Sequence, residues 1–159
     1  MARTTTDHTV VIVAADKNGV VRKEAIADEA LIPGYLVRFD ADEELENHAT
    51  AAGVLVGKLV VLETLTPDTA AYPTTAAISI PYEVGDTAYY AEGQPGDVFN
   101  MLLADGETAV KGISQLISNG DGTLKVETVD GDTIAGSIVG VADADVTASG
   151  ATRCRVRIT

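Results

Sequence analysis

The chain has 159 residues and a formal net charge of −13, because 24 acidic side chains oppose 11 basic ones. Binding of DNA or RNA by counterion release needs clustered Lys and Arg, so this charge predicts a protein without a nucleic-acid partner. The single cysteine excludes an intramolecular disulfide framework, and the lack of an 18-residue apolar span or an apolar signal-peptide segment predicts no membrane partner and no export by that route.

The N-terminal region begins with eight residues that are mostly polar and rich in threonine. We expect a flexible arm over residues 1–8, followed by a single β domain over residues 9–159. The apolar run at residues 9–14 predicts the first strand, and Asp-Lys-Asn-Gly at residues 16–19 predicts a turn. Residues 23–30 are the best candidate for a short helical turn.

A Pro-Gly pair at residues 33–34 predicts the next turn. Residues 35–40 then alternate in polarity, with Tyr35, Val37 and Phe39 on one face, which is typical of a half-buried strand. The acidic run that follows predicts a solvated loop or a short exposed helix.

That acidic run, residues 40–46, contains three adjacent carboxylates, at Asp42, Glu43 and Glu44. General acid–base catalysis needs two carboxyl groups whose environments separate their pKa values. Adjacent acids on an exposed segment have nothing to separate them, so we interpret the run as solvated charge.

The middle of the chain predicts three strands and one long loop. Residues 57–63 are continuously apolar and β-branched, which predicts a strand covered on both faces. Residues 65–77 have two prolines and no period, which predicts a surface loop. Residues 78–82 and 86–92 are the next two predicted strands, and Pro81 places the first of these at an edge or a bulge.

Residues 96–126 consist of short apolar runs separated by turn sequences. Asn119 and Gly120 both tolerate positive φ, which a tight hairpin connection requires, and Leu124 and Val126 resume the alternation of a strand. No catalytic residue types cluster in this segment, so it predicts a β scaffold without a reactive site.

The C-terminal third predicts two further strands. Residues 132–142 are almost continuously apolar, and Gly136 and Gly140 within them mark either bulges or places where another backbone approaches closely. Residues 143–150 form a turn region, and residues 151–159 alternate strictly. Cys154 lies on the apolar face of this last strand, where a small buried core residue is expected.

The opposite face of the last strand carries Arg153, Arg155 and Arg157. Three guanidinium groups in a row repel one another unless carboxylates compensate them. Two arrangements satisfy this requirement: pairing with acids of the same chain, or an intersubunit contact in which each arginine binds carboxylates of a neighbouring copy.

The succession of short strands and Gly, Asp and Pro turns defines the expected fold. It predicts an all-β protein, a compact small barrel or sandwich of about eight or more short strands with at most one or two short helices. Repeated amphipathic helices, which a βαβ fold needs, are absent from the sequence.

No motif in the sequence predicts an enzyme, a cofactor or a metal site. His8 lies in the expected arm and His48 near the acidic run, and no Gly-x-Ser-x-Gly elbow or phosphate-binding loop is present. The Asn-Gly-Asp-Gly turn at residues 119–122 resembles half of a calcium loop, but Ile117 and Thr128 stand where an EF-hand has acids. We therefore expect no small-molecule substrate.

Two stretches of the C-terminal part resemble the small decoration proteins of tailed bacteriophages, also called cement or head-stabilising proteins. They are NMLLADGETAVKGISQLISNGDGTLKVE at residues 100–127 and GSIVGVADADVTASGATRCRVRIT at residues 136–159. Both combine Gly-spaced apolar strands and acidic turns, and the second ends in a strand of alternating apolar and basic residues.

This resemblance implies a non-enzymatic virion protein, made in the host cytoplasm, that binds the exterior of the expanded capsid. Its partners would be the major capsid protein and itself, as a homotrimer at three-fold and quasi-three-fold positions that stabilises the head by bridging capsomers. The expected capsid contacts in the arm are Arg3, Thr4, Thr5, Thr6, Asp7 and His8. The expected contacts between copies are Arg153, Arg155, Arg157, Pro67, Tyr72 and Pro73.

The alternative is a receptor- or glycan-binding β module of a phage tail or fibre. Glycan sites favour exposed aromatic side chains, and this chain has no tryptophan.

Overall fold

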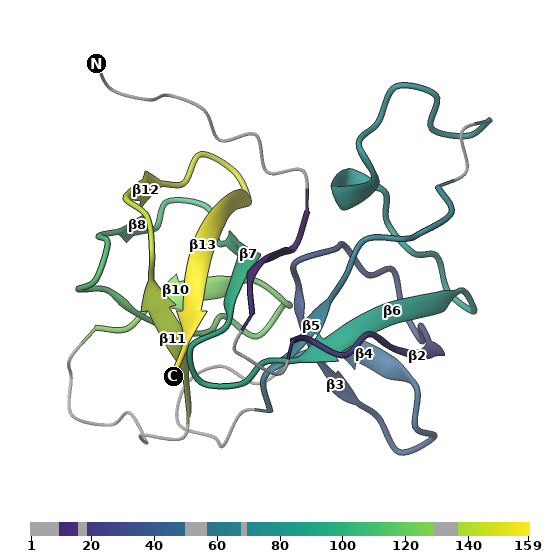
Figure 1. The fold of residues 1–159 in the computed structure, drawn as a ribbon, viewed down its shortest axis with the longest axis horizontal. Helices are drawn as coiled ribbons and strands as arrows, with labels where there is room; N and C mark the ends of the chain where they lie inside the picture. The colour runs from purple at the N-terminus through teal and green to yellow at the C-terminus, as the bar shows by residue number, and fades with distance from the viewer. Residues whose placement is uncertain (1–9, 16–18, 50–56, 68–69, 129–136) are drawn as a thin grey trace.

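Two β-sheets, formed mainly by the two halves of the chain, lie side by side (Figure 1). The structure is a computed structural model that describes residues 10–15, 19–49, 57–67, 70–128 and 137–159. Within these residues it contains thirteen strands and one short 3-10 helix, η1 (Ala77–Ser79). The predicted all-β class is confirmed. The predicted arm, residues 1–8, lies outside the described residues.

The first sheet has five strands in the order β2-β6-β5-β3-β4. An isolated bridge between Ala27, which follows β2, and Leu45 in β4 joins the two edges of this sheet. Its strands are β2 (Lys23–Ile26), β3 (Leu36–Phe39), β4 (Leu45–Asn47), β5 (Leu59–Val61) and β6 (Thr87–Glu92).

The second sheet has six strands in the order β1-β7-β10-β9-β11-β13, and an additional pairing of β7 with β13 closes five of them into a ring. β1 pairs with β7 outside that ring. These strands are β1 (Ile12–Ala14), β7 (Val98–Leu103), β9 (Gln115–Ser118), β10 (Leu124–Val126), β11 (Ile138–Ala142) and β13 (Thr152–Ile158). β8 (Thr108–Ala109) and β12 (Val146–Thr147) form a separate two-stranded sheet.

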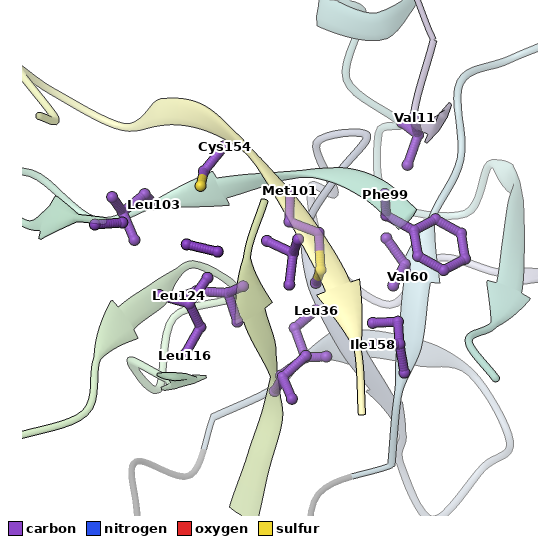
Figure 2. Close-up of a cluster of buried hydrophobic side chains, with 14 of the residues drawn as sticks. Val11, Leu36, Val60, Phe99, Met101, Leu103, Leu116, Leu124, Cys154 and Ile158 are labelled. Carbon is purple, nitrogen blue, oxygen red and sulfur yellow. The ribbon is translucent and has the colours of Figure 1, made fainter. Parts of the chain in front are cut away.

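The larger of two hydrophobic clusters combines side chains from both sheets (Figure 2). Leu36 and Val60 enter it from the first sheet, and Phe99, Met101 and Ile158 enter it from the second. The first sheet therefore packs one face against the core of the second and uses the other face for its own smaller cluster. Such shared burial supports the single domain predicted for residues 9–159, which stays a prediction.

β3 and β5 lie between the two clusters, so consecutive residues are buried on opposite faces. In β5, Val60 belongs to the larger cluster and Val61 to the smaller, which confirms a strand covered on both faces. In β3 the strand was predicted correctly, but its half-buried character was wrong. Leu36 is fully buried because the second sheet covers the face that the alternation assigned to solvent. On the other face Val37 is fully buried, whereas Phe39 is 40% exposed.

The helical turn predicted for residues 23–30 is wrong. Lys23–Ile26 forms β2, which pairs antiparallel with β6 from Lys23 opposite Tyr90 to Ile26 opposite Thr87. Lys, Glu and Ala favour helices, but tertiary pairing overrides a propensity of a few tenths of a kcal/mol per residue.

Two other predicted elements change type. Residues 40–46 are not wholly a loop or helix, since Leu45, which is fully buried, begins β4. The strand predicted over residues 78–82 is also wrong: Ile78 lies in η1, and Tyr82 forms an isolated bridge with Leu31. Pro81, which has no backbone N–H, separates these two features.

The hairpin between β9 and β10 is confirmed, but its connection is longer than predicted. Ser118 pairs with Leu124, so five residues form the loop, and Gly120 and Gly122 adopt positive φ. Burial acts to raise the pKa of Asp121, but hydrogen bonds from Thr123 and Asn119 outweigh it and lower that pKa below its ordinary value. These bonds make the Asn-Gly-Asp-Gly sequence a self-capped turn.

Gly140 fulfils both roles predicted for it. The pairing of β11 with β9 shifts register between Ile138 and Gly140, and an added Cβ at Gly140 would collide with the backbone carbonyl of Arg157 on β13. Gly136 lies outside the described residues.

We expect Cys154 to stay unreactive towards iodoacetamide in the folded protein. Its side chain is buried, and burial raises the pKa of the thiol from 9.0 to about 11, so little thiolate exists at neutral pH. The folded-state pKa exceeds the unfolded one, so the stability due to the neutral thiol is present below about pH 9 and is lost as the pH rises towards about 11. Mass spectrometry after alkylation with and without denaturant measures this, and equal labelling in both would contradict the burial.

No helix among the described residues is both long and apolar enough to cross a membrane.

Candidate contact surfaces

The first described residues of the chain are fixed between the two sheets. Val11 is fully buried in the larger cluster, and its carbonyl accepts a hydrogen bond of 2.7 Å from the backbone N–H of Asn100. The Asn100 side-chain amide donates to the carbonyl of Val10 over 2.6 Å. The described chain is therefore anchored at Val10 and Val11, directly after the residues that contain the predicted capsid contacts.

A buried carboxylate completes this anchor from the first sheet. Glu63, which follows β5, is 7% exposed and accepts the N–H of Val11 at Oε2 over 3.0 Å. Its Oε1 accepts from Arg22 over 2.8 Å, and Arg22 also donates to the Glu63 carbonyl over 3.1 Å. The strand prediction for residues 57–63 included Glu63 but gave no sign of this role, because its partners lie far away in the sequence.

Arg153, at the start of the predicted arginine face, is used within the chain. Its guanidinium donates to the carbonyl of Pro33 over 2.8 Å and to the carbonyl of Ile78, so it connects β13 to the turn before β3 and to η1. Burial lowers the pKa of this guanidinium. Sequence reasoning placed Arg153 on the correct face but could not identify these uncharged partners.

The other two arginines of β13 share one neighbour. Arg157 forms an ion pair with Asp143 over 2.9 Å, as predicted for pairing with acids of the same chain. Arg155 donates to the backbone carbonyl of Asp143 over 3.4 Å, which is a long hydrogen bond. A role of these arginines between copies stays a prediction.

The loop predicted over residues 65–77 lies at the surface where it is described. Pro67 and Pro73 are exposed, and Tyr72 is half-buried. These residues are accessible for the intersubunit contact predicted for them, which stays a prediction.

The turn between β3 and β4 gathers carboxylates. Asp40 and Glu44 place oxygens within 4.8 Å of one another and of Asp28, an arrangement that a cation could occupy. Asp40 Oδ1 also accepts the backbone N–H groups of Asp42 over 2.9 Å and of Glu44 over 2.8 Å, so this carboxylate has a structural role in the turn.

Of the two histidines, His48 lies in the part of the chain that the structure describes, and it is 4% exposed. Its Nδ1 lies 2.9 Å from Ser118 Oγ, which connects the end of β4 to the hairpin of the second sheet. A nucleophile and a base in contact resemble a catalytic pair, but both side chains are buried, so the contact serves packing between the sheets.

No family model matches this chain, and no curated protein matches it. Among solved structures it is similar to the head fiber gp8.5 N base in bacteriophage phi29, with a TM-score of 0.53. The likeness covers 89% of this chain and 95% of that chain at 15% sequence identity. At this identity the likeness is one of fold. That neighbour is a phage head fibre protein.

Proposed function

We propose that this chain is a non-enzymatic structural protein of a phage virion that binds the outside of the capsid. The observation that carries the proposal is the fold, which matches a phage head fibre base over nearly the whole length of both chains. The decoration-protein resemblance of residues 100–127 and 136–159 supports the same class, since these segments contain β9, β10, β11, β13 and most of β7 of the second sheet.

The proposed mechanism is attachment through the N-terminal arm of several copies. The anchor formed by Glu63 and Asn100 at Val11 supports it, because a pull on residues 1–9 would act on the buried core instead of on a loose end. In a homotrimer, the second and third arms bind at high effective concentration once the first is attached, so modest contacts give strong retention and bridge capsomers. The contacts between copies are assigned to the arginine face of β13 and to residues 65–77.

Deleting residues 1–8 is expected to leave a folded protein that no longer stays on capsids. The deletion removes the proposed shell contacts but ends before Val10 and Val11, which hold β1 in place. The measurement adds purified full-length and shortened protein to expanded heads that lack it, followed by sedimentation and electron microscopy.

Each result of that experiment has a defined meaning. Bare shells with the full-length protein would contradict the proposed function itself. Full occupancy by the shortened protein would contradict the arm assignment only. Circular dichroism of both proteins is the control for folding.

The second candidate is the base of a fibre, or a receptor- or glycan-binding module of a phage tail or fibre. The structural neighbour is the base of a head fiber, and this likeness favours the second candidate over other binding proteins. The same micrographs distinguish the two: a decoration protein covers three-fold positions over the whole shell, whereas a fibre base gives density at few sites and a tail module leaves the shell bare.

A further inference from the structure

The loop between β9 and β10, residues 119–123, contains both an Asn-Gly and an Asp-Gly sequence. Glycine has no Cβ, so its backbone nitrogen can closely approach the side chain of the residue before it. In such sequences that nitrogen attacks the side-chain carbonyl carbon and forms a five-membered succinimide. The β9–β10 loop therefore carries two sequences that are prone to spontaneous modification.

The reaction at Asn119 makes and breaks defined bonds. The backbone nitrogen of Gly120 gives up its proton and bonds to Asn119 Cγ, and the Cγ–Nδ2 bond breaks, so the side-chain nitrogen leaves as ammonia. One water molecule then opens the succinimide. Opening at the side-chain carbonyl gives aspartate, and opening at the main-chain carbonyl gives isoaspartate, which adds one carbon to the backbone.

Both reacting groups of this pair are held by hydrogen bonds. The N–H of Gly120 donates to Ser118 Oγ over 3.2 Å, so its proton is directed at that hydroxyl. Asn119 Nδ2 donates to Asp121 Oδ2 over 3.2 Å and to Thr123 Oγ1 over 3.3 Å. The nitrogen and Cγ can therefore react only after the backbone bond breaks and the amide leaves its two acceptors.

The carboxylate of Asp121 opposes the same reaction. Attack on Asn119 Cγ places negative charge on the amide oxygen, and a neighbouring carboxylate repels that charge. Burial acts to raise the pKa of Asp121, but hydrogen bonds from Thr123 and Asn119 outweigh it and lower that pKa. Asp121 thus stays ionised at neutral pH, and an ionised carboxylate resists attack by the nitrogen of Gly122.

Packing against the first sheet keeps the loop closed. The carbonyl of Gly122 accepts the N–H of Leu36 on β3 over 2.8 Å, and Ser118 Oγ lies 2.9 Å from His48 Nδ1. An added Cβ at Gly122 would lie 2.6 Å from Asn47 Oδ1, so β4 also lies directly against the loop. Freeing the loop therefore means separating it from β3 and β4.

We propose that Asn119 is a site of spontaneous deamidation whose rate is set by opening of the β9–β10 loop away from the first sheet. While the loop is closed the site is protected, and each opening exposes the Asn-Gly sequence to reaction. Either product lacks the Nδ2 donor, and isoaspartate also lengthens the loop, so the modified chain cannot restore this contact. The inference concerns the chemical lifetime of the fold and does not depend on the proposed function.

Rates in the folded and the unfolded chain test this inference. The purified protein is incubated at mildly alkaline pH with and without guanidinium chloride, and samples are digested with trypsin. Mass spectrometry follows the peptide 112–125, and fragmentation assigns the mass increase to Asn119. We expect deamidation of the folded chain to be about tenfold slower or more, because it requires opening of the loop.

Ser118→Ala and Thr123→Val each remove a hydroxyl that holds one reacting group. Both are expected to speed deamidation of the folded protein about fivefold. Ser114→Ala is the matched control, because its hydroxyl accepts the backbone N–H of Val110 over 2.9 Å in a different turn. It is expected to leave the rate at Asn119 unchanged. In denaturant, all three variants should react at the wild-type rate.

Equal rates in the folded and unfolded wild-type chain would overturn the inference. Unchanged folded-state rates in both Ser118→Ala and Thr123→Val, or an equal acceleration by Ser114→Ala, would overturn it too. Circular dichroism identifies a variant that fails to fold, and the other of the pair then carries the test.

Asn119→Asp tests the consequence of the modification. A carboxylate at this position replaces the amide that donates to Asp121, so two like charges face each other in the loop. We expect the melting temperature to fall, and an unchanged melting temperature would contradict the proposed effect on the loop.

Discussion

Replacing Gly140 with alanine is expected to lower the free energy of unfolding by about 3 kcal/mol or more. The added Cβ would collide with the carbonyl oxygen of Arg157 and would lie 2.9 Å from its carbonyl carbon. Both atoms belong to the backbone of β13, so no side-chain rotation relieves the collision. β13 would have to move away from β11, and it also pairs with β7, so the closed ring of the second sheet would be strained.

Thermal and denaturant unfolding measure this effect. For a protein of this size, about 3 kcal/mol corresponds to a fall in the melting temperature of about 6–12 °C. Gly57→Ala is the matched control, because an added Cβ there meets no atom within 4 Å. A stability for Gly140→Ala close to that of Gly57→Ala would show that β11 and β13 are not packed as closely as described.

Replacing Glu63 with alanine is expected to cost about 2–3 kcal/mol of stability and to release β1. The substitution leaves the N–H of Val11 and the guanidinium of Arg22 without their carboxylate partner. Arg22 keeps 29% of its side-chain exposure and can turn towards water, which holds the cost below that of a fully buried pair.

Hydrogen exchange at the amide of Val11 distinguishes release of β1 from a general loss of stability. We expect this amide to lose its protection in Glu63→Ala by more than the amides of β7 do. Glu46→Ala, which breaks the partly exposed pair with Arg38, is the control, with an expected cost of about 0.5 kcal/mol. Unchanged protection of Val11 would show that Glu63 does not hold the N-terminal segment.

The Glu63 anchor also affects the proposed attachment to the capsid. An arm that holds a protein on a capsid is effective only if its inner end stays attached to the body. Glu63→Ala is therefore expected to reduce capsid retention even with residues 1–8 present, whereas Glu46→Ala is not. The sedimentation assay with expanded heads measures both.

The strands of the second sheet could be predicted from the sequence, because their side-chain alternation is local. β13 reads as alternating arginine and apolar residues, and the structure buries Cys154, Val156 and Ile158 as that pattern requires. Gly140 was likewise identified, since glycine within an apolar strand indicates a bulge or a close approach.

The first sheet was harder to predict because its strands are short and their partners are distant. Lys23–Ile26 has a composition that favours a helix, and only its pairing with β6, some sixty residues later, makes it a strand. The alternation over residues 35–40 placed Leu36 on the solvent face of its strand. It is buried only because the second sheet packs against that face.

The residues of the candidate contact surfaces also differ in how far the sequence predicted them. The sequence by itself determined the all-β class, the arginine face and the apolar face of the last strand, because period-2 geometry fixes which side chains share a face. Only the tertiary structure decided what each arginine does. Arg153 contacts Pro33, 120 residues away, and Glu63 contacts Val11, 52 residues away. Contacts between residues so far apart depend on how the two sheets pack, and a local sequence pattern does not predict that packing.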